Sequence, residues 1–220
     1  MLPLRDVIPS RTAPVVTVTL IVLNALAWLF ELSMPREALT AFLQAWGVVP
    51  AAFAPVTLVS SMFLHGGWSH VIGNMWWLWI FGDNLEDRFG HGRFIVFYLL
   101  CGFVAAFGQM ALHPTSIVPM IGASGAIAGV MGAYFVLYPH SRVLTLIPLI
   151  IFWDVIELPA IFLLGFWFVM QLFSAGAIAV TASTGGAGGG VAFMAHVAGF
   201  VAGVVGVFVF RKKQPPHDWV

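Results

Sequence analysis

Six long apolar runs alternate with short polar segments along this chain. They lie near residues 15–32, 69–86, 94–112, 120–138, 158–180 and 191–210. About 20 apolar residues in an α-helix are needed to cross the roughly 30 Å hydrocarbon core of a bilayer. The pattern therefore predicts an all-α membrane protein, built as a bundle of six transmembrane helices.

A further apolar run, Val143 to Trp153, contains Pro148 and is too short to cross a bilayer. We expect an interfacial or re-entrant segment there.

With six spans both termini share one side, and that side holds all but one of the nine basic residues, Arg36 being the exception. Basic residues accumulate on the cytoplasmic side of membrane proteins, so both termini are predicted to be cytoplasmic.

The composition agrees with a single membrane domain. Hydrophobic residues make up 60% of the 220 and charged residues only 8%, a mixture that excludes a soluble globular protein of this size. The sequence has no basic stripe that could follow a nucleic acid backbone, so no nucleic acid partner is expected. We predict one domain over residues 1–220, with a core at about 15–210 and a short cytoplasmic tail at 211–220.

Four polar side chains are expected at one depth in this bundle. In the predicted topology the second, fourth and sixth helices begin at the outer face, and His70, Asn74, Ser124 and His196 lie near those beginnings. One to two helical turns place Ser124 and His196 on the order of 10 Å below the outer rim. Polar side chains at membrane depth are costly and usually functional, so these four are candidate site residues.

Ser124 and His196 are the candidate catalytic pair. A serine hydroxyl is a weak nucleophile until a base removes its proton, and a neutral imidazole within hydrogen-bond reach is the usual base. Most carboxylates map to the cytoplasmic side, and only Glu31 and Glu37 lie near the outer face, beside the first helix. We therefore predict a Ser–His dyad rather than a Ser–His–Asp triad.

His70 and Asn74 are candidate donors to an oxyanion hole. They are four residues apart and so share one face of a helix, and the backbone amide of Ser124 could add a third donor. Gly122 and Gly125 would let the chain pass close to a bound substrate. Together these groups predict a site that hydrolyses amide bonds within the membrane.

Small residues predict a close contact between the fourth and sixth helices. Gly125 and Gly129 are four residues apart, and so are Gly199 and Gly203, directly after His196. Such spacings let the backbones of membrane helices approach closely. This approach would bring the serine to the histidine.

The combined motifs resemble the rhomboid family of intramembrane serine proteases. The resemblance covers the chain from about residue 60 to 210 and rests on His65-Gly-Gly-Trp-Ser-His70-Val-Ile-Gly-Asn74, Gly-Ala-Ser124-Gly, Ala-His196-Val-Ala-Gly199-Phe-Val-Ala-Gly203 and the segment from Glu86 to Phe94. It implies a six-helix core of the rhomboid type. It also implies Ser124 as nucleophile, His196 as general base and acid, and His70 with Asn74 in the oxyanion hole.

The resemblance further implies cleavage of transmembrane proteins near the outer membrane face, where substrate helices are locally unstable. Single-span proteins are then the expected substrates and lipid the surroundings, with no cofactor and no metal. This chain departs from the family at two places. Ala128 stands four positions after the serine, where members often carry an aromatic residue that stacks on the catalytic histidine, and the first outer loop has Trp46-Gly47 in place of a Trp-Arg pair.

Three other functions stay open at this stage. A channel or transporter could use His196, Asp154 and Glu157 along a conduction path. A catalytically inactive relative could only bind membrane clients. A metal site could draw on His65, His70 and His196 as nitrogen ligands.

Further expectations accompany the protease hypothesis. Gly185 to Gly190 would form a mobile cap over the sixth helix. Substrate access is expected past the fifth helix, whose aromatic residues are Phe162, Phe166, Trp167 and Phe168. Glu86 and Arg88 are expected to pair and to anchor the turn between the second and third helices. The predicted location is a bacterial-type plasma membrane.

Overall fold

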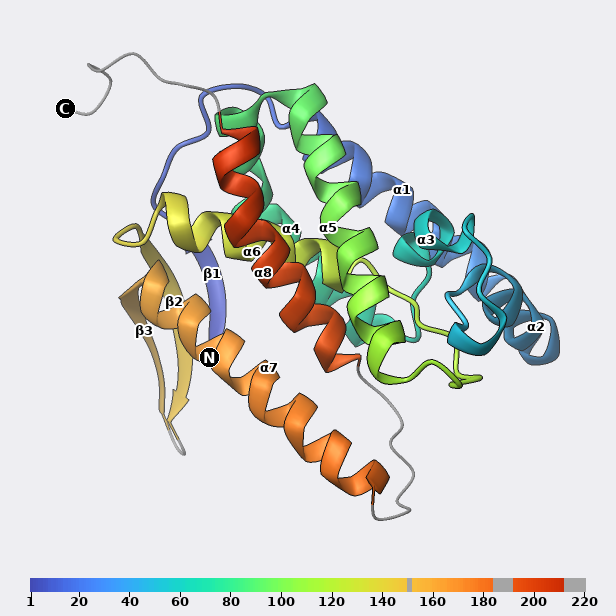
Figure 1. Ribbon diagram of the computed structural model, residues 1–220. Coiled ribbons are helices and arrows are strands. Elements are labelled where there is room, and N and C mark those ends of the chain that lie inside the picture. The colour runs from blue at the N-terminus through green and yellow to red at the C-terminus, as the bar shows by residue number, and fades with distance from the viewer. Residues whose placement is uncertain (150–151, 184–191, 212–220) are drawn as a thin grey trace.

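The computed structural model describes residues 1–149, 152–183 and 192–211. Within them, each of the six apolar runs contains a helix (Figure 1). These helices are α1 (Val15–Leu32), α4 (Trp68–Phe89), α5 (His91–Leu112), α6 (Ser124–Leu137), α7 (Ala160–Ser183) and α8 (Phe193–Phe210). The chain is thus mostly helical, as its hydrophobic pattern predicts.

Among the described residues, four helices are long and apolar enough to cross a membrane by length and composition: α1, α5, α7 over Ala160–Ala177, and α8. Helix α6 is apolar but has only 14 residues, which gives about 21 Å at 1.5 Å per residue. Helix α4 has 22 residues and ends in a charged turn. The four apolar spans make the chain an integral membrane protein.

A folded loop connects α1 to α4. It contains α2 (Arg36–Trp46), η1 (Pro50–Ala52), α3 (Thr57–Ser60) and η2 (Ser61–Phe63). The backbone groups of Val48 and Met120 exchange two hydrogen bonds, of 3.0 and 2.8 Å, and the N–H of Gly122 donates to the carbonyl of Ser61 at 2.8 Å. The loop therefore holds the segment that leads into α6.

Three strands form an antiparallel sheet in the order β1–β2–β3: β1 (Leu2–Asp6), β2 (Arg142–Leu149) and β3 (Phe152–Pro159). Leu2 pairs with Leu146 and Val143 with Leu158. The expectation of an all-α fold is therefore wrong at this place. The described residues of the run from Val143 to Trp153 belong to the strands β2 and β3, and its interfacial or re-entrant location stays a prediction.

The sequence of this run explains why it forms strands. Val143 and Thr145 are fully buried, whereas Arg142 is exposed and Leu144 half-buried, and this alternation is typical of a strand with one covered face. β-Branched residues favour that conformation. The partner strand β1 comes from the other end of the chain, so no local pattern around residue 143 reveals the pairing.

Helices α6 and α8 pack with their backbones in contact, and Figure 1 shows α8 crossing α6. A Cβ added at Gly199 would overlap the carbonyl oxygen of Gly125, and one added at Gly203 would overlap that of Gly129. Only glycine permits this distance between two helices. We call these four residues the glycine seam.

Helix α7 packs more loosely than the other apolar spans. In the 18-residue apolar window of α7, 17% of the residues are buried. The corresponding share is 28% to 33% for α1, α5 and α8. Phe162, Phe166 and Phe173 are exposed on its outer face, while Leu163 and Leu164 are buried against the bundle. Helix α7 is therefore an edge helix with one packed side.

Glu86 joins the end of α4 to the beginning of α1. Its buried carboxylate accepts hydrogen bonds from the backbone N–H groups of Val16 and Thr17 and from the Thr17 hydroxyl, each 2.8 Å long, and lies 2.5 Å from Nδ1 of His91. A carboxylate at a helix start satisfies N–H groups that have no partner inside the helix. The expected pair of Glu86 with Arg88 is wrong, since Glu86 pairs with His91.

Candidate active site

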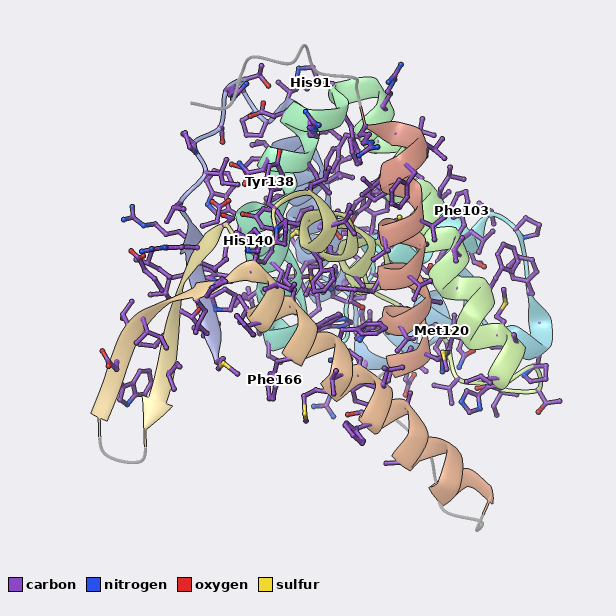
Figure 2. The ribbon with its side chains drawn as sticks, turned by 60° about the vertical axis from the view of Figure 1, so that its left-hand side comes forward. His91, Phe103, Met120, Tyr138, His140 and Phe166 are labelled. Carbon is purple, nitrogen blue, oxygen red and sulfur yellow. The ribbon has the colours of Figure 1, made fainter. Side chains whose placement is uncertain are left out.

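Ser124 and His196 are in direct contact. The Oγ atom of Ser124 lies 2.8 Å from Nε2 of His196. Ser124 is the first residue of α6 and His196 lies in the first turn of α8, so the glycine seam begins directly beside the pair. In Figure 2, Met120 lies near the end of the bundle where α8 begins, and His91, the partner of Glu86, lies at the opposite end.

The side chains of His70 and Asn74 converge on Gly122, two residues before the serine. A Cβ built on Gly122 would lie 2.6 Å from Nε2 of His70 and 3.5 Å from Nδ2 of Asn74. Gly122 has a φ of +116°, a conformation that side chains disfavour. The two nitrogens thus face a backbone position that only glycine leaves free.

Hydrogen bonds determine which ring nitrogen of His70 carries its proton. The backbone N–H of Gly66 donates to Nδ1 of His70 at 3.3 Å, so Nδ1 is the acceptor nitrogen. The proton of the neutral ring then lies on Nε2, which faces Gly122. His70 is therefore a donor toward the space beside Ser124.

His65 orients Asn74. Nδ2 of Asn74 lies 3.0 Å from Nε2 of His65, and the backbone N–H of His65 donates to both carboxylate oxygens of Glu31 at 3.2 Å. The His65 side chain is 1% exposed; burial, with a smaller contribution from nearby His70, lowers its pKa to about 4. His65 stays neutral and accepts one Asn74 hydrogen, which leaves the other amide hydrogen for a ligand.

A cavity of about 720 Å³ opens at this pair. Its wall combines the ends of helices α4, α6 and α8 with the segment before α6. The polar side chains that face it include His70, Asn74, Ser124 and His196. The four residues predicted to share one layer therefore line one space, which is large enough for a stretch of peptide.

Two residues of α7 complete the surroundings of His196. Oε1 of Gln171 lies 2.8 Å from Nδ1 of His196, and the ring of Trp167 lies 5.8 Å from the imidazole, tilted by 37°. Sequence reasoning placed Trp167 on the side of substrate access and assigned nothing to Gln171. An amide within an apolar run was the available signal, because polar side chains at membrane depth are usually functional.

The other predicted groups lie elsewhere. Asp154 and Glu157 are on β3, where Glu157 pairs with Arg142 at 2.8 Å, and neither lines the cavity. Within the described ranges, no three His, Cys, Asp or Glu side chains are grouped closely enough to hold a metal ion. The predicted cap, Gly185 to Gly190, lies outside the described residues.

The fold and the site define a helical integral membrane protein with a serine–histidine pair beside an open cavity. The sequence model of the Rhomboid domain matches residues 52–213. The chain belongs to the Rhomboid family.

Individual relatives agree with this assignment. Rhomboid-like protein 11, chloroplastic, from Arabidopsis thaliana is 28% identical over 86% of this chain and 66% of its own length. Rhomboid protein 1, mitochondrial, from Saccharomyces cerevisiae is 33% identical over 40% of this chain and 27% of its own. Rhomboid protease GluP from Bacillus subtilis is 37% identical over 34% of this chain and 14% of its own length. The chain spans two thirds of the length of these relatives or less.

Proposed function

We propose that this chain is an intramembrane serine endopeptidase that hydrolyses transmembrane proteins near the outer membrane face with a dyad of Ser124 and His196. The observation that carries the proposal is the 2.8 Å contact between Ser124 Oγ and His196 Nε2. The two side chains come from different helices, so their contact depends on the fold rather than on sequence proximity. Membership of a family that includes proteases supports the reaction class.

The reaction follows from these positions. As Ser124 Oγ bonds to the carbonyl carbon of the substrate, Nε2 of His196 takes the hydroxyl proton. His196 then returns that proton to the departing amine as the peptide C–N bond breaks. Water attacks the resulting ester with His196 again as base, which releases the new carboxyl end and restores Ser124.

The donors around Gly122 suit the charge that forms during this attack. His70 Nε2–H and the second amide hydrogen of Asn74 face the space beside Ser124, and the backbone amide of Ser124 completes the proposed oxyanion hole. Fixed donors around a developing oxyanion are often the largest catalytic contribution. Gly122 allows the substrate carbonyl to approach them closely, and Gly125 and Gly199 hold the two catalytic helices together.

The proposed topology has six spans, with α4 and the short α6 added to the four long apolar helices, and both termini in the cytoplasm. Eight of the nine basic residues then lie on the cytoplasmic side, as expected for membrane proteins. We propose a bacterial-type plasma membrane as the location, in line with a relative from Bacillus subtilis. Single-span proteins would reach the cavity past α7, the most weakly buried apolar span.

Cleavage by the purified protein in liposomes tests the proposal. The wild type should cut a single-span substrate, and Ser124→Ala and His196→Ala should each abolish cleavage while leaving the thermal unfolding temperature unchanged. Ser33→Ala and His140→Ala change the same residue types away from the cavity and should cleave normally. A chelator should have no effect, and a fluorophosphonate probe should label Ser124.

Each contrary outcome points to a different function. Cleavage by Ser124→Ala, or its loss with a chelator, would exclude the serine mechanism and favour a metal site. A folded wild type that neither cleaves nor reacts with the probe would identify an inactive protein that binds membrane clients. Ion or solute flux through the liposomes without cleavage would favour a channel or transporter.

A further inference from the structure

Both ring nitrogens of His196 have a partner. Nε2 lies 2.8 Å from Ser124 Oγ, and Nδ1 lies 2.8 Å from Oε1 of Gln171. A side-chain amide oxygen only accepts hydrogen bonds, so Nδ1 carries the ring proton. The lone pair of Nε2 then faces the serine hydroxyl, and this is the tautomer that a general base needs.

We propose that Gln171 is a positioning residue for His196 and takes the place that a carboxylate has in a catalytic triad. The proposal rests on the proposed function and adds one residue to it. The amide orients the ring and selects its tautomer, but it has no charge with which to stabilise the imidazolium that forms during proton transfer. Gln171 acts through His196 and not on the substrate.

A second contact from the same helix supports this role. Trp167 is one turn before Gln171, so the two side chains share one face of α7. The Trp167 ring covers the imidazole at 5.8 Å, while Gln171 holds its Nδ1 end. Ala128, on the helix of the serine, is fully buried and has no ring to stack. Helix α7 therefore supplies the contact that α6 lacks.

No carboxylate competes for Nδ1 among the described residues. The cavity that His196 shares is lined by two other titratable side chains, His70 and His113, and by no Asp, Glu, Lys or Arg. The nearby amide of Gln109 accepts the backbone N–H of Ala195 at 3.3 Å. Gln171 is thus the acceptor that the structure provides for Nδ1 of His196.

Gln171 lies on α7, whereas the serine and the histidine lie on α6 and α8. The distance between Ser124 and His196 depends on α6 and α8, whereas the orientation of the imidazole depends on α7. A displacement of α7 would leave the pair adjacent but free the His196 ring to rotate or to change tautomer. Full activity therefore requires α7 to be docked against α8.

Two substitutions at residue 171 test the role. Gln171→Met keeps the length of the side chain without the acceptor, and it should lower kcat by about 10- to 100-fold, the range for one hydrogen bond to an essential group. KM should stay unchanged, because Gln171 does not touch the substrate. Gln171→Glu restores an acceptor and should recover most of the lost kcat.

The pH profile separates positioning from packing. In Gln171→Glu the new carboxylate favours the imidazolium, so the acid limb of the kcat profile should move to higher pH than in the wild type. The other titratable side chains that line the cavity, His70 and His113, are the same in both proteins and so cannot cause a difference between the two profiles. Met170→Leu changes the exposed neighbour on the same helix and should leave kcat, KM and the profile unchanged.

The opposite results would overturn the proposal. Gln171 would be only a packing residue if Gln171→Met had the kcat of the wild type. The same conclusion would follow if Gln171→Glu were as slow as Gln171→Met and its pH profile of kcat were not shifted. The ¹⁵N chemical shifts of the His196 ring test the contact without activity: Nδ1 should be protonated in the wild type and partly deprotonated in Gln171→Met. If the wild type cleaves nothing, the proposed function fails, and an unchanged tautomer in Gln171→Met would then separately overturn this inference.

Discussion

The glycine seam and the contact with α7 hold the same histidine in different ways. At the seam, two helix backbones touch, and no side chain could be added without overlap. At α7, the histidine is held by one hydrogen bond to Gln171 and by the ring of Trp167. Only 17% of the residues in the apolar window of α7 are buried. Position and orientation of the base are therefore controlled by different parts of the bundle.

This difference indicates which part of the site can move without unfolding the protein. Backbone contacts between close-packed helices have no alternative arrangement of similar energy, because a protein interior has no free space for one. A side-chain contact at the edge of a bundle can open locally at small cost. A lateral path for a substrate helix is thus compatible with a fixed Ser124–His196 distance.

Gly203→Ala should have the largest effect, because the added Cβ overlaps the carbonyl of Gly129. We expect the two helices to separate, with a loss of about 1–3 kcal/mol or more of unfolding free energy and no cleavage. Gly176→Ala is the matched control on α7, where a Cβ meets nothing within 4 Å. Thermal unfolding and cleavage check both variants, and equal stability of the two would contradict the role of the seam.

Lowering the pH should reduce the unfolding free energy through His65, the residue that holds Asn74 of the proposed oxyanion hole. The pKa of His65 is about 4 in the folded protein and 6.5 as its ordinary value, so between these pH values the unfolded chain binds more protons. His65 therefore costs the fold nothing above pH 6.5, and the unfolding free energy should fall by on the order of 3 kcal/mol as the pH is lowered from 6.5 to 4.

The measurement is the unfolding free energy of the wild type and of His65→Gln across that pH range. The variant should lack this part of the slope, whereas the exposed-site control His140→Gln should retain it. Identical slopes for the wild type and His65→Gln would show that His65 is not held in its neutral form by the fold.

Trp167→Leu should reduce activity and should lower stability less than Gly203→Ala does, because Trp167 packs on Trp77 and Phe200 through side chains and not through backbone contacts. Loss of one aromatic contact corresponds to a decrease of about 2- to 10-fold in kcat, while Trp167→Phe should keep most of the activity. Trp79→Leu makes the same change at an exposed tryptophan of α4 that does not line the cavity, and it should behave as the wild type. If Trp167→Leu lowered the unfolding temperature as much as Gly203→Ala, the distinction between the two contacts would fail.

Phe173→Ala should have the smallest effect. Its side chain is 71% exposed on the outer face of α7, so in detergent the unfolding free energy should change by less than about 0.5 kcal/mol. Cleavage of a detergent-soluble substrate should also be unchanged. A large loss in either measurement would mean that this face of α7 carries a tight contact after all.

Sequence reasoning worked best where a pattern has one physical cause. Apolar runs of about 20 residues identified the positions of six of the helices in the described part of the chain, since hydrocarbon excludes most other backbone conformations. The same reasoning brought Ser124, His196, His70 and Asn74 into one layer, because helices that begin at one face place their first turns at one depth. The structure brings these four side chains around a single cavity.

It failed where partners are distant or signals are weak. Strand β1 pairs with β2 across most of the chain, and no local periodicity encodes such a pairing. His65 precedes α4, so helical spacing does not predict its contact with Asn74. Gln171 lies among apolar residues of α7, and its direction could be known only once α7 and α8 were placed side by side.

The position of β1 also has a consequence for biosynthesis. Its Pro3 carbonyl accepts a hydrogen bond of 2.6 Å from Nε1 of Trp76, and Leu2 pairs with Leu146. At 5–20 residues per second, roughly 7 to 28 seconds of translation separate the emergence of this strand from that of its partner. Strand β1 must therefore wait without its partner strand until α1, α4, α5 and α6 have been synthesised.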